Sequence, residues 1–155
     1  MAIGLSQQMN SLFYIATFLI MLHWNTSSIP SSSFTPFAAA QPGSALGNAT
    51  FYTAPYVPSS CFGFDKDQFP AGNLFAAASE YLWNDRKACG KHFRVSCVGG
   101  TNLGVAKPCK PGSIIVRIVD KCPLPGCQGT LDLSAEAFNT IADPDAGKVM
   151  ISYIE

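Results

Sequence analysis

The feature that most constrains the fold of this chain is a set of six cysteines, all of which lie between Cys61 and Cys127. Two chemistries use so many cysteines in a short stretch, namely disulfide cross-linking and zinc binding. Spacing disfavours zinc, because no C-x-x-C pair occurs and His92 is the only histidine after His23. The cysteines therefore predict a small domain held together by disulfides, with no metal site and no other cofactor.

A disulfide framework needs an oxidising compartment, and the N-terminal region carries a candidate secretion signal. Residues 12–24 form a mainly apolar run of thirteen residues, whereas a membrane-spanning helix needs about 20. No Lys or Arg precedes the run, and Met9 is an alternative start. Cleavage after Ala40 fits the A-x-A pattern of signal peptidase sites, with cleavage nearer Ser28 or an uncleaved anchor as alternatives.

Charge divides the chain in two. No Asp, Glu, Lys or Arg precedes Asp65, so the ten acidic and ten basic side chains all lie in residues 65–155. This part is near neutral and has no basic patch, which makes nucleic acid and anionic membranes poor partners. We predict a signal peptide and Ser/Pro-rich lead over residues 1–40 and one secreted, monomeric domain over residues 41–155.

Short segments of β-forming residues, separated by turn residues, recur through the predicted domain. One of them alternates Phe93, Val95 and Cys97 with polar side chains, which is the period of a half-buried strand. The six predicted strands are residues 47–53, 73–79, 91–98, 113–120, 131–133 and 148–154. One helical turn is predicted at residues 80–84, and a helix from its N-cap Ser134 to Ala142, with Glu136 in the first turn. Six short strands with one or two short helices predict a mainly β fold that closes into a six-stranded barrel.

Two aspartates occupy strand positions where they can form a site. Asp132 lies between Leu131 and Leu133. Because neighbours in a strand point to opposite faces, leucines in the core place Asp132 on the outer surface. Asp120 ends the preceding strand, and the loop from Cys122 to Cys127 leads back between the two, so both carboxylates are predicted to line one groove.

Each aspartate also has a purely structural interpretation. Asp120 can cap its own loop by accepting backbone N–H groups, and this is as well supported as a functional role. Asp132 can cap the start of the following helix, but Ser134 already occupies the N-cap position. A functional role is therefore favoured for Asp132 and left open for Asp120.

The first predicted strand adds further candidates. Phe51 and Tyr52 fall on opposite faces, so one is predicted to be core and the other exposed. An outward Tyr52, beside Thr50, can stack on a sugar ring or hydrogen-bond to it. The alternative is a rim aromatic packed against Pro55–Tyr56. Asn48 begins an N-A-T sequence, which is an N-glycosylation sequon on or beside the strand.

In their order and spacing, several short motifs resemble the double-psi β-barrel of expansin first domains, which one family of endoglucanases shares. These motifs are A-T-F-Y (49–52), A-C-G (88–90), F-R-V-S-C (93–97), V-D-K-C-P (119–123) and G-T-L-D-L-S (129–134). The resemblance covers residues 46–154. A narrower resemblance, to the plant natriuretic peptides, rests on P-Y-V-P-S-S-C (55–61), L-W-N-D-R-K-A-C-G-K (82–91), T-N-L-G-V (101–105) and I-A-D-P-D-A-G-K (141–148).

Plant natriuretic peptides are secreted, expansin-like single domains associated with water and solute homeostasis and with stress or defence. The resemblance implies an apoplastic protein without the second, carbohydrate-binding domain of true expansins after Glu155. It also implies the disulfides Cys61–Cys89 and Cys97–Cys109, which leaves Cys122 with Cys127, while His92 stands near a position of the third expansin pair. Each disulfide is expected to stabilise the fold by about 2 to 4 kcal/mol.

The resemblance also bears on catalysis. Inverting glycoside hydrolysis needs an acid and a base, with their carboxyls about 6.5 to 9.5 Å apart. Asp132 matches the endoglucanase acid, but Ala54 stands at the position of the base, and a methyl group cannot accept a proton. Asp120 is a substitute base whose position across a substrate is open. Hydrolysis is therefore not expected, although the similar bacterial septal lytic transglycosylases, which need no hydrolytic water, keep an enzymatic alternative open.

Two functional hypotheses remain. In the first, which the narrower resemblance favours, the protein is an extracellular signal that acts on a plasma-membrane receptor through residues 52–61. In the second, it is a non-hydrolytic module that holds cell-wall polysaccharide in a groove formed by Thr50, Tyr52, Asp120 and Asp132. Bacterial expansins have a tyrosine where Cys122 stands, which removes one stacking contact and counts against the second hypothesis, whereas the presence of Asp132 supports it.

Overall fold

The computed structural model describes residues 42–155, and the predicted leader at residues 1–40 lies outside them. Within the described residues the strands are β1 (Ala45–Tyr52), β2 (Phe75–Ala78), β3 (His92–Gly100), β4 (Ile114–Lys121), β5 (Leu131–Ser134) and β6 (Val149–Ile154). The helices are α2 (Glu80–Trp83), α3 (Ala135–Ile141) and the 3₁₀ turns η1 (Lys66–Gln68), η2 (Ala71–Asn73) and η3 (Pro144–Ala146). All six predicted strands are present, although β2 begins later than predicted because the residues before it form η2.

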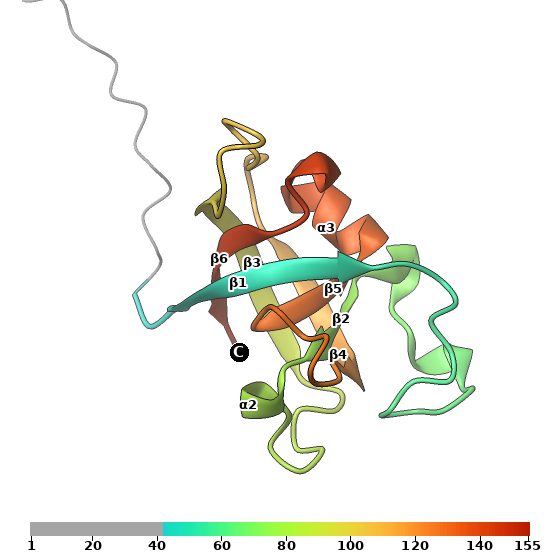
Figure 1. Ribbon diagram of the computed structural model, residues 1–155. Coiled ribbons are helices and arrows are strands. Elements are labelled where there is room, and N and C mark those ends of the chain that lie inside the picture. Colours follow the sequence, from blue (N-terminus) through green and yellow to red (C-terminus); the bar gives the residue numbers. More distant parts are fainter. Residues whose placement is uncertain (1–41) are drawn as a thin grey trace, which may run out of the picture. The chain divides into compact units, whose positions relative to one another are not determined.

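The strands close into a barrel in the order β1-β5-β2-β4-β3-β6 (Figure 1). β1 pairs parallel with β5, and β2 pairs parallel with β4, while the other neighbours are antiparallel. Parallel neighbours cannot be joined by a tight hairpin, so the chain travels far between them. One consequence is that both neighbours of β1 come from the C-terminal end of the chain, residues 131–154. The predicted fold class, a six-stranded barrel with short helices, is confirmed.

Alternate residues of the strands fill the barrel. Val95, Val116 and Ile118 are among the fully buried side chains. In β3 the buried residues Phe93, Val95 and Cys97 share one face, as the alternation in the sequence predicted. α3 packs across β1, β4 and β5. It begins at the predicted N-cap, where Ser134 Oγ accepts a hydrogen bond from the Ala137 N–H at 3.1 Å.

A second apolar cluster lies outside the barrel core and is centred on Phe75. Phe75 is fully buried, but its neighbour Ala76 faces the core, so the phenyl ring points outward. The ring centroid lies 6.2 Å from that of Tyr52, 4.8 Å from that of Tyr56 and 4.8 Å from that of Phe69. Tyr56 and Phe69 belong to residues 53–74, the connection from β1 to β2, which we call the rim segment. The rim segment therefore covers part of the outer face of the barrel.

This cover corrects the prediction for the end of β1. One of Phe51 and Tyr52 was expected in the core and the other exposed, but both side chains are half-buried. The Phe51 ring packs on Phe138 of α3, with centroids 4.8 Å apart. Tyr52, on the other face, packs under the rim segment instead of facing solvent.

The disulfides join Cys61 to Cys89, Cys97 to Cys109 and Cys122 to Cys127, the pairs that the family resemblance implied. Cys61–Cys89 ties the rim segment to the turns after α2. Cys97–Cys109 ties β3 to the loop that precedes β4. Cys122–Cys127 closes the short loop between β4 and β5. The framework therefore secures loops around a barrel whose strands pair without it.

Two further observations concern residues 42–155 alone. None of the helices in this part is both long enough and apolar enough to cross a membrane. In the same part of the chain, the His, Cys, Asp and Glu side chains form no group of three or more that could hold a metal ion.

Candidate functional site

Asp132 is presented on the outer face of β5, as the alternation of the strand predicted. Leu131 and Leu133 are fully buried in the core, and Asp132 between them is half-buried. Its Oδ1 accepts a hydrogen bond from Thr50 Oγ1 at 2.7 Å, directly across the parallel β1–β5 pair. The alternative role as a helix cap is wrong, because the N-cap of α3 is Ser134.

Asp132 belongs to a row of residues that crosses four neighbouring strands. Thr50 pairs with Asp132, Asp132 pairs with Ala77, and Ala77 pairs with Asp120. We call these four residues the aspartate row. Neighbouring strands lie about 4.8 Å apart, so the Cα atoms of the two aspartates are separated by roughly 10 Å. The structure thus brings Thr50, Asp120 and Asp132 together on one face.

A register shift brings Asp120 into the row. Ile118 points into the core, and simple alternation along β4 would turn Asp120 inward as well. The pairing of β2 with β4 shifts between Ala76 and Ala77, so that Ala76 pairs with Ile118 but Ala77 pairs with Asp120. An extra residue in one strand re-aims the side chains that follow it. Asp120 consequently lies half-buried on the outer face.

One oxygen of Asp120 has the structural role that the sequence left open. Oδ1 accepts hydrogen bonds from the Ser60 N–H at 2.7 Å and from the Lys121 N–H at 2.8 Å. In the described part of the chain Oδ2 accepts no hydrogen bond. Asp120 therefore fixes the rim segment through Ser60 and uses only Oδ1 to do so.

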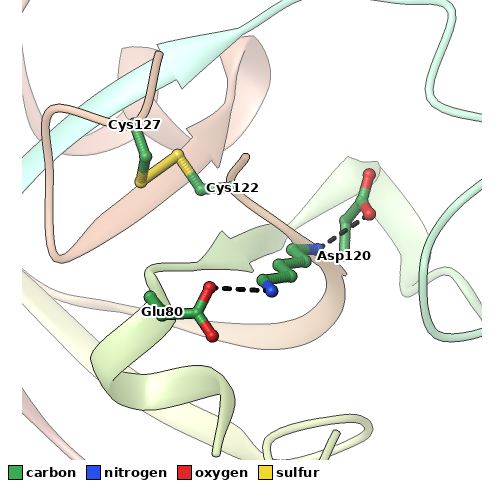
Figure 2. A network of polar contacts seen from close by, with 5 residues as sticks. Glu80, Asp120, Cys122 and Cys127 are labelled. Carbon is green, nitrogen blue, oxygen red and sulfur yellow. Dashed lines mark hydrogen bonds and ion pairs between the residues drawn. A yellow bond between two sulfur atoms is a disulfide. The ribbon is translucent and has the colours of Figure 1, made fainter. Parts of the chain in front are cut away.

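The two residues after Asp120 hold the end of β4 in place (Figure 2). Lys121 Nζ lies 2.7 Å from Glu80 Oε2 and 5.9 Å from the centre of the Trp83 ring, so α2 anchors this side chain. Cys122 donates its N–H to the Ala78 carbonyl at 2.9 Å and forms the disulfide with Cys127. Sequence analysis missed Glu80 and Lys121, because no local pattern pairs a helix residue with a strand residue so far along the chain.

Tyr52 lies beside the aspartate row with its hydroxyl buried. The ring packs edge-on against Tyr56, with centroids 5.3 Å apart. Burial is the main cause of the raised pKa of Tyr52, and the charges of Asp120 and then Asp132 raise it further. The hydroxyl makes no hydrogen bond to a described residue. Packing against Tyr56 matches the rim interpretation, and sugar stacking by Tyr52 stays a prediction.

The environment of Asp132 alters its acidity. Burial raises the pKa of this carboxyl, the hydrogen bond from Thr50 lowers it, and the nearby charge of Asp120 raises it, with an upward net direction. Asp132 therefore holds its proton to a higher pH than an exposed aspartate does. A protonated carboxyl can donate a hydrogen bond to a sugar oxygen, and an ionised one can accept from a sugar hydroxyl.

Glu136 of α3 anchors the rim segment through two hydrogen bonds. Its Oε2 accepts from the Tyr56 hydroxyl at 2.6 Å, and its Oε1 accepts from Asn73 Nδ2 at 2.7 Å. The hydrogen bond from Tyr56 is the main cause of the lowered pKa of Glu136. Burial and the same hydrogen bond raise the pKa of Tyr56 to about 12. Sequence analysis assigned Glu136 only to the first turn of a helix and missed this contact, which depends on the folded path of the rim segment.

A pocket of about 420 Å³ lies between two parts of the rim segment, residues 54–57 and 66–73. Ala54, the residue at the position of the endoglucanase base, lines it together with Tyr56, Phe69 and Pro70. None of the described residues that line this pocket carries a carboxylate. A base at this position would therefore have to come from outside the pocket.

Comparison with known proteins places this geometry among expansin-like barrels. A family model described as lytic transglycolase, a double-psi barrel family, matches residues 75–153. An EG45-like domain containing protein of Citrus jambhiri is 55% identical over 107 residues, which cover 69% of this chain and 78% of that protein. An EG45-like relative from Arabidopsis thaliana is 48% identical over 107 residues, 69% of this chain and 80% of the relative.

Among solved structures, the chain is similar to the expansin of Clavibacter michiganensis. An aspartate-to-asparagine mutant of that protein, crystallised in complex with cellohexaose, superimposes with a TM-score of 0.54 at 28% sequence identity. The match covers 72% of this chain and 49% of the expansin chain. This chain thus spans about half the length of that expansin.

Proposed function

The chain belongs to the EG45-like domain proteins of the double-psi barrel family, and we propose that it is a secreted, non-hydrolytic, expansin-like protein that binds a cell-wall polysaccharide across the aspartate row. The observation that carries this proposal is the row itself. Two half-buried carboxyls lie on one outer face. Asp132 accepts a hydrogen bond from the Thr50 hydroxyl, and Asp120 accepts hydrogen bonds from the backbone N–H groups of Ser60 and Lys121. The complex of the similar Clavibacter expansin with cellohexaose supports a sugar as the ligand.

Binding without hydrolysis is the better-supported chemistry. Asp132, with its raised pKa, has the character of an acid, but an inverting mechanism also needs a base that activates water. At the position that the endoglucanase resemblance gives to the base stands Ala54, whose methyl group cannot accept a proton. Asp120 commits one carboxylate oxygen to two backbone N–H groups. These features favour a surface that holds a polysaccharide over one that cuts it.

A binding isotherm on isolated plant wall fractions tests the proposal. We expect saturable binding by the oxidised protein and binding about tenfold weaker for Asp132→Asn, equivalent to ~1.4 kcal/mol. Asp145→Asn, at an exposed aspartate in η3 outside the row, is the matched control and should bind like the wild type. Equal binding by all three proteins, or none by the wild type, would contradict the proposal. Release of reducing sugar during incubation would contradict its non-hydrolytic part.

A second candidate function is extracellular signalling in water and solute homeostasis and in stress or defence. The observation that favours it is the exposure of Thr53, Ala54, Pro55, Pro58 and Ser60 within the segment 52–61, together with the resemblance to plant natriuretic peptides. A plasma-membrane receptor is the partner under this hypothesis. It predicts that purified protein changes protoplast volume and that Asp132→Asn is as active as the wild type. No change in volume or ion flux at any concentration would exclude it.

A further inference from the structure

The sequon of β1 lies on the same face as the aspartate row. Ala49 is fully buried in the barrel, so Asn48 and Thr50 on either side of it point outward. Thr50 is therefore both the hydroxyl residue of the sequon and the hydrogen-bond donor to Asp132. The side-chain amide of Asn48 forms no hydrogen bond with the described residues, and the residue is half-buried.

We propose that Asn48 carries an N-linked glycan that is attached before β1 joins the barrel, and that this glycan then controls access of polysaccharide to the aspartate row. The second half of this inference rests on the proposed function, and the first half does not. In the reaction, Asn48 Nδ2 bonds to the first carbon of the sugar, and the sugar leaves the pyrophosphate of a lipid-linked oligosaccharide. The amide proton passes to the transferring enzyme.

In the folded protein, hydrogen bonds occupy the Asn48 backbone and the Thr50 hydroxyl of the sequon. In the barrel the Asn48 N–H donates to Thr130 Oγ1 at 3.2 Å, and the Asn48 carbonyl accepts from the Thr130 N–H at 2.7 Å. Gly129 is required beside this contact, because a Cβ there would lie 3.0 Å from the Asn48 carbonyl oxygen. Thr50 Oγ1 is engaged by Asp132. A transferring enzyme that needs the flexible N-x-S/T segment and its hydroxyl must therefore act earlier.

The topology provides that interval. Both neighbours of β1 come from residues 131–154, and Thr50 precedes its partner Asp132 by 82 residues. At a synthesis rate of about 5 to 20 residues per second, roughly 4 to 16 s pass between the emergence of the two residues. During that time β1 has no strand to pair with, and its sequon stays available.

Once the barrel has closed, the proposed glycan lies on β1 beside the aspartate row, on the side of Thr50 away from Tyr52. Asn48 is two residues from Thr50, about 6.8 Å along the strand. On the other side of Thr50, Tyr52 and Tyr56 pack against each other and close the approach. Asn48 therefore lies on the side of Thr50 that these two rings leave uncovered, and the first sugars of a glycan there compete with a polysaccharide for the surface beside Thr50 and Asp132.

The test uses the full chain secreted from a glycosylating host, compared with Asn48→Gln from the same host. Peptide mass mapping should find the Asn48 peptide glycosylated. Wall binding by the glycosylated protein should be about tenfold weaker than binding by Asn48→Gln, a loss of ~1.4 kcal/mol. Wild-type protein made in a bacterium without glycosylation is a second glycan-free form and should bind like Asn48→Gln.

A relocated sequon is the matched control. Arg94→Asn creates the sequence N-V-S on β3, which is the strand opposite β5 in the closed order, at an exposed position. Asn48→Gln combined with Arg94→Asn should carry a glycan and still bind like Asn48→Gln alone. Equal weakening by the relocated glycan, or equal binding by glycosylated wild type and Asn48→Gln, would overturn the control of access.

The modification itself has separate readouts. An unmodified Asn48 peptide would overturn the first half of the inference. Translation with microsomes present should glycosylate Asn48. Folded protein added to detergent-permeabilised microsomes should remain unmodified, and its modification would overturn the proposed order of events. If Asn48→Gln and the bacterial protein both fail to bind wall fractions, the proposed function and the control of access fail together, while the mass data still decide the modification.

Discussion

Asp132 makes the stability of the protein depend on pH in a way that one substitution can reveal. Its pKa is raised in the folded state, with burial as the main cause. The protonated Asp132 carboxyl therefore stabilises the folded protein fully below its unfolded pKa of about 3.9, and this contribution is lost as pH rises through its folded pKa. Asn at this position stays neutral and can still accept from Thr50. We expect the melting temperature of Asp132→Asn, relative to wild type, to rise between pH 3 and pH 7, as thermal melts would measure. A difference that is constant with pH, or one that Asp145→Asn shares, would contradict this.

At the scale of the elements, the rim segment is held to α3 by Glu136 through Tyr56 and Asn73. Tyr56→Phe removes one of these hydrogen bonds and leaves the ring on Phe75, so we expect faster amide exchange in residues 53–74 and a global stability loss of at most about 1 kcal/mol. Since the folded pKa of Glu136 is lowered, the contact is present above its unfolded pKa and lost as pH falls through the folded value. The wild-type rim should therefore lose protection in acid. Tyr81→Phe, at an exposed tyrosine, should leave exchange unchanged; faster exchange throughout the barrel would assign Tyr56 to the core instead.

For the whole molecule, the three disulfides should contribute unequally, because they close loops of different length. Cysteine partners are 28, 12 and 5 residues apart for Cys61–Cys89, Cys97–Cys109 and Cys122–Cys127. Restriction of the unfolded chain then predicts losses of about 3.5, about 3 and about 2 kcal/mol when each pair is replaced by serine. Denaturant unfolding of the three double variants measures the order. A largest loss at Cys122–Cys127 would mean that this disulfide stabilises the native end of β4 more than it restricts the unfolded chain.

The sequence by itself determined the number of strands, the inward positions of β3 and β5 and the N-cap of α3. These features depend on local rules, namely the two-residue period of a strand and the hydrogen bond of a cap, which the residues nearby are sufficient to satisfy. The outward direction of Asp132 follows from the same rule, since Leu131 and Leu133 can only share the opposite face. The disulfide pairs came from the family resemblance, because spacing alone permits other pairings.

Only the tertiary structure decided how the candidate site is assembled. The local period of β4 gives no sign that Asp120 faces outward, because the register shift opposite Ala77 arises from pairing with a distant strand. The burial of Tyr52 likewise depends on Tyr56 and Phe75, which the rim segment brings over β1. Glu136 accepts hydrogen bonds from Tyr56 and Asn73, which lie 80 and 63 residues away from it in the sequence. Such contacts form when the barrel closes, since their free energy comes from burial and pairing between segments that have no contact in the unfolded chain.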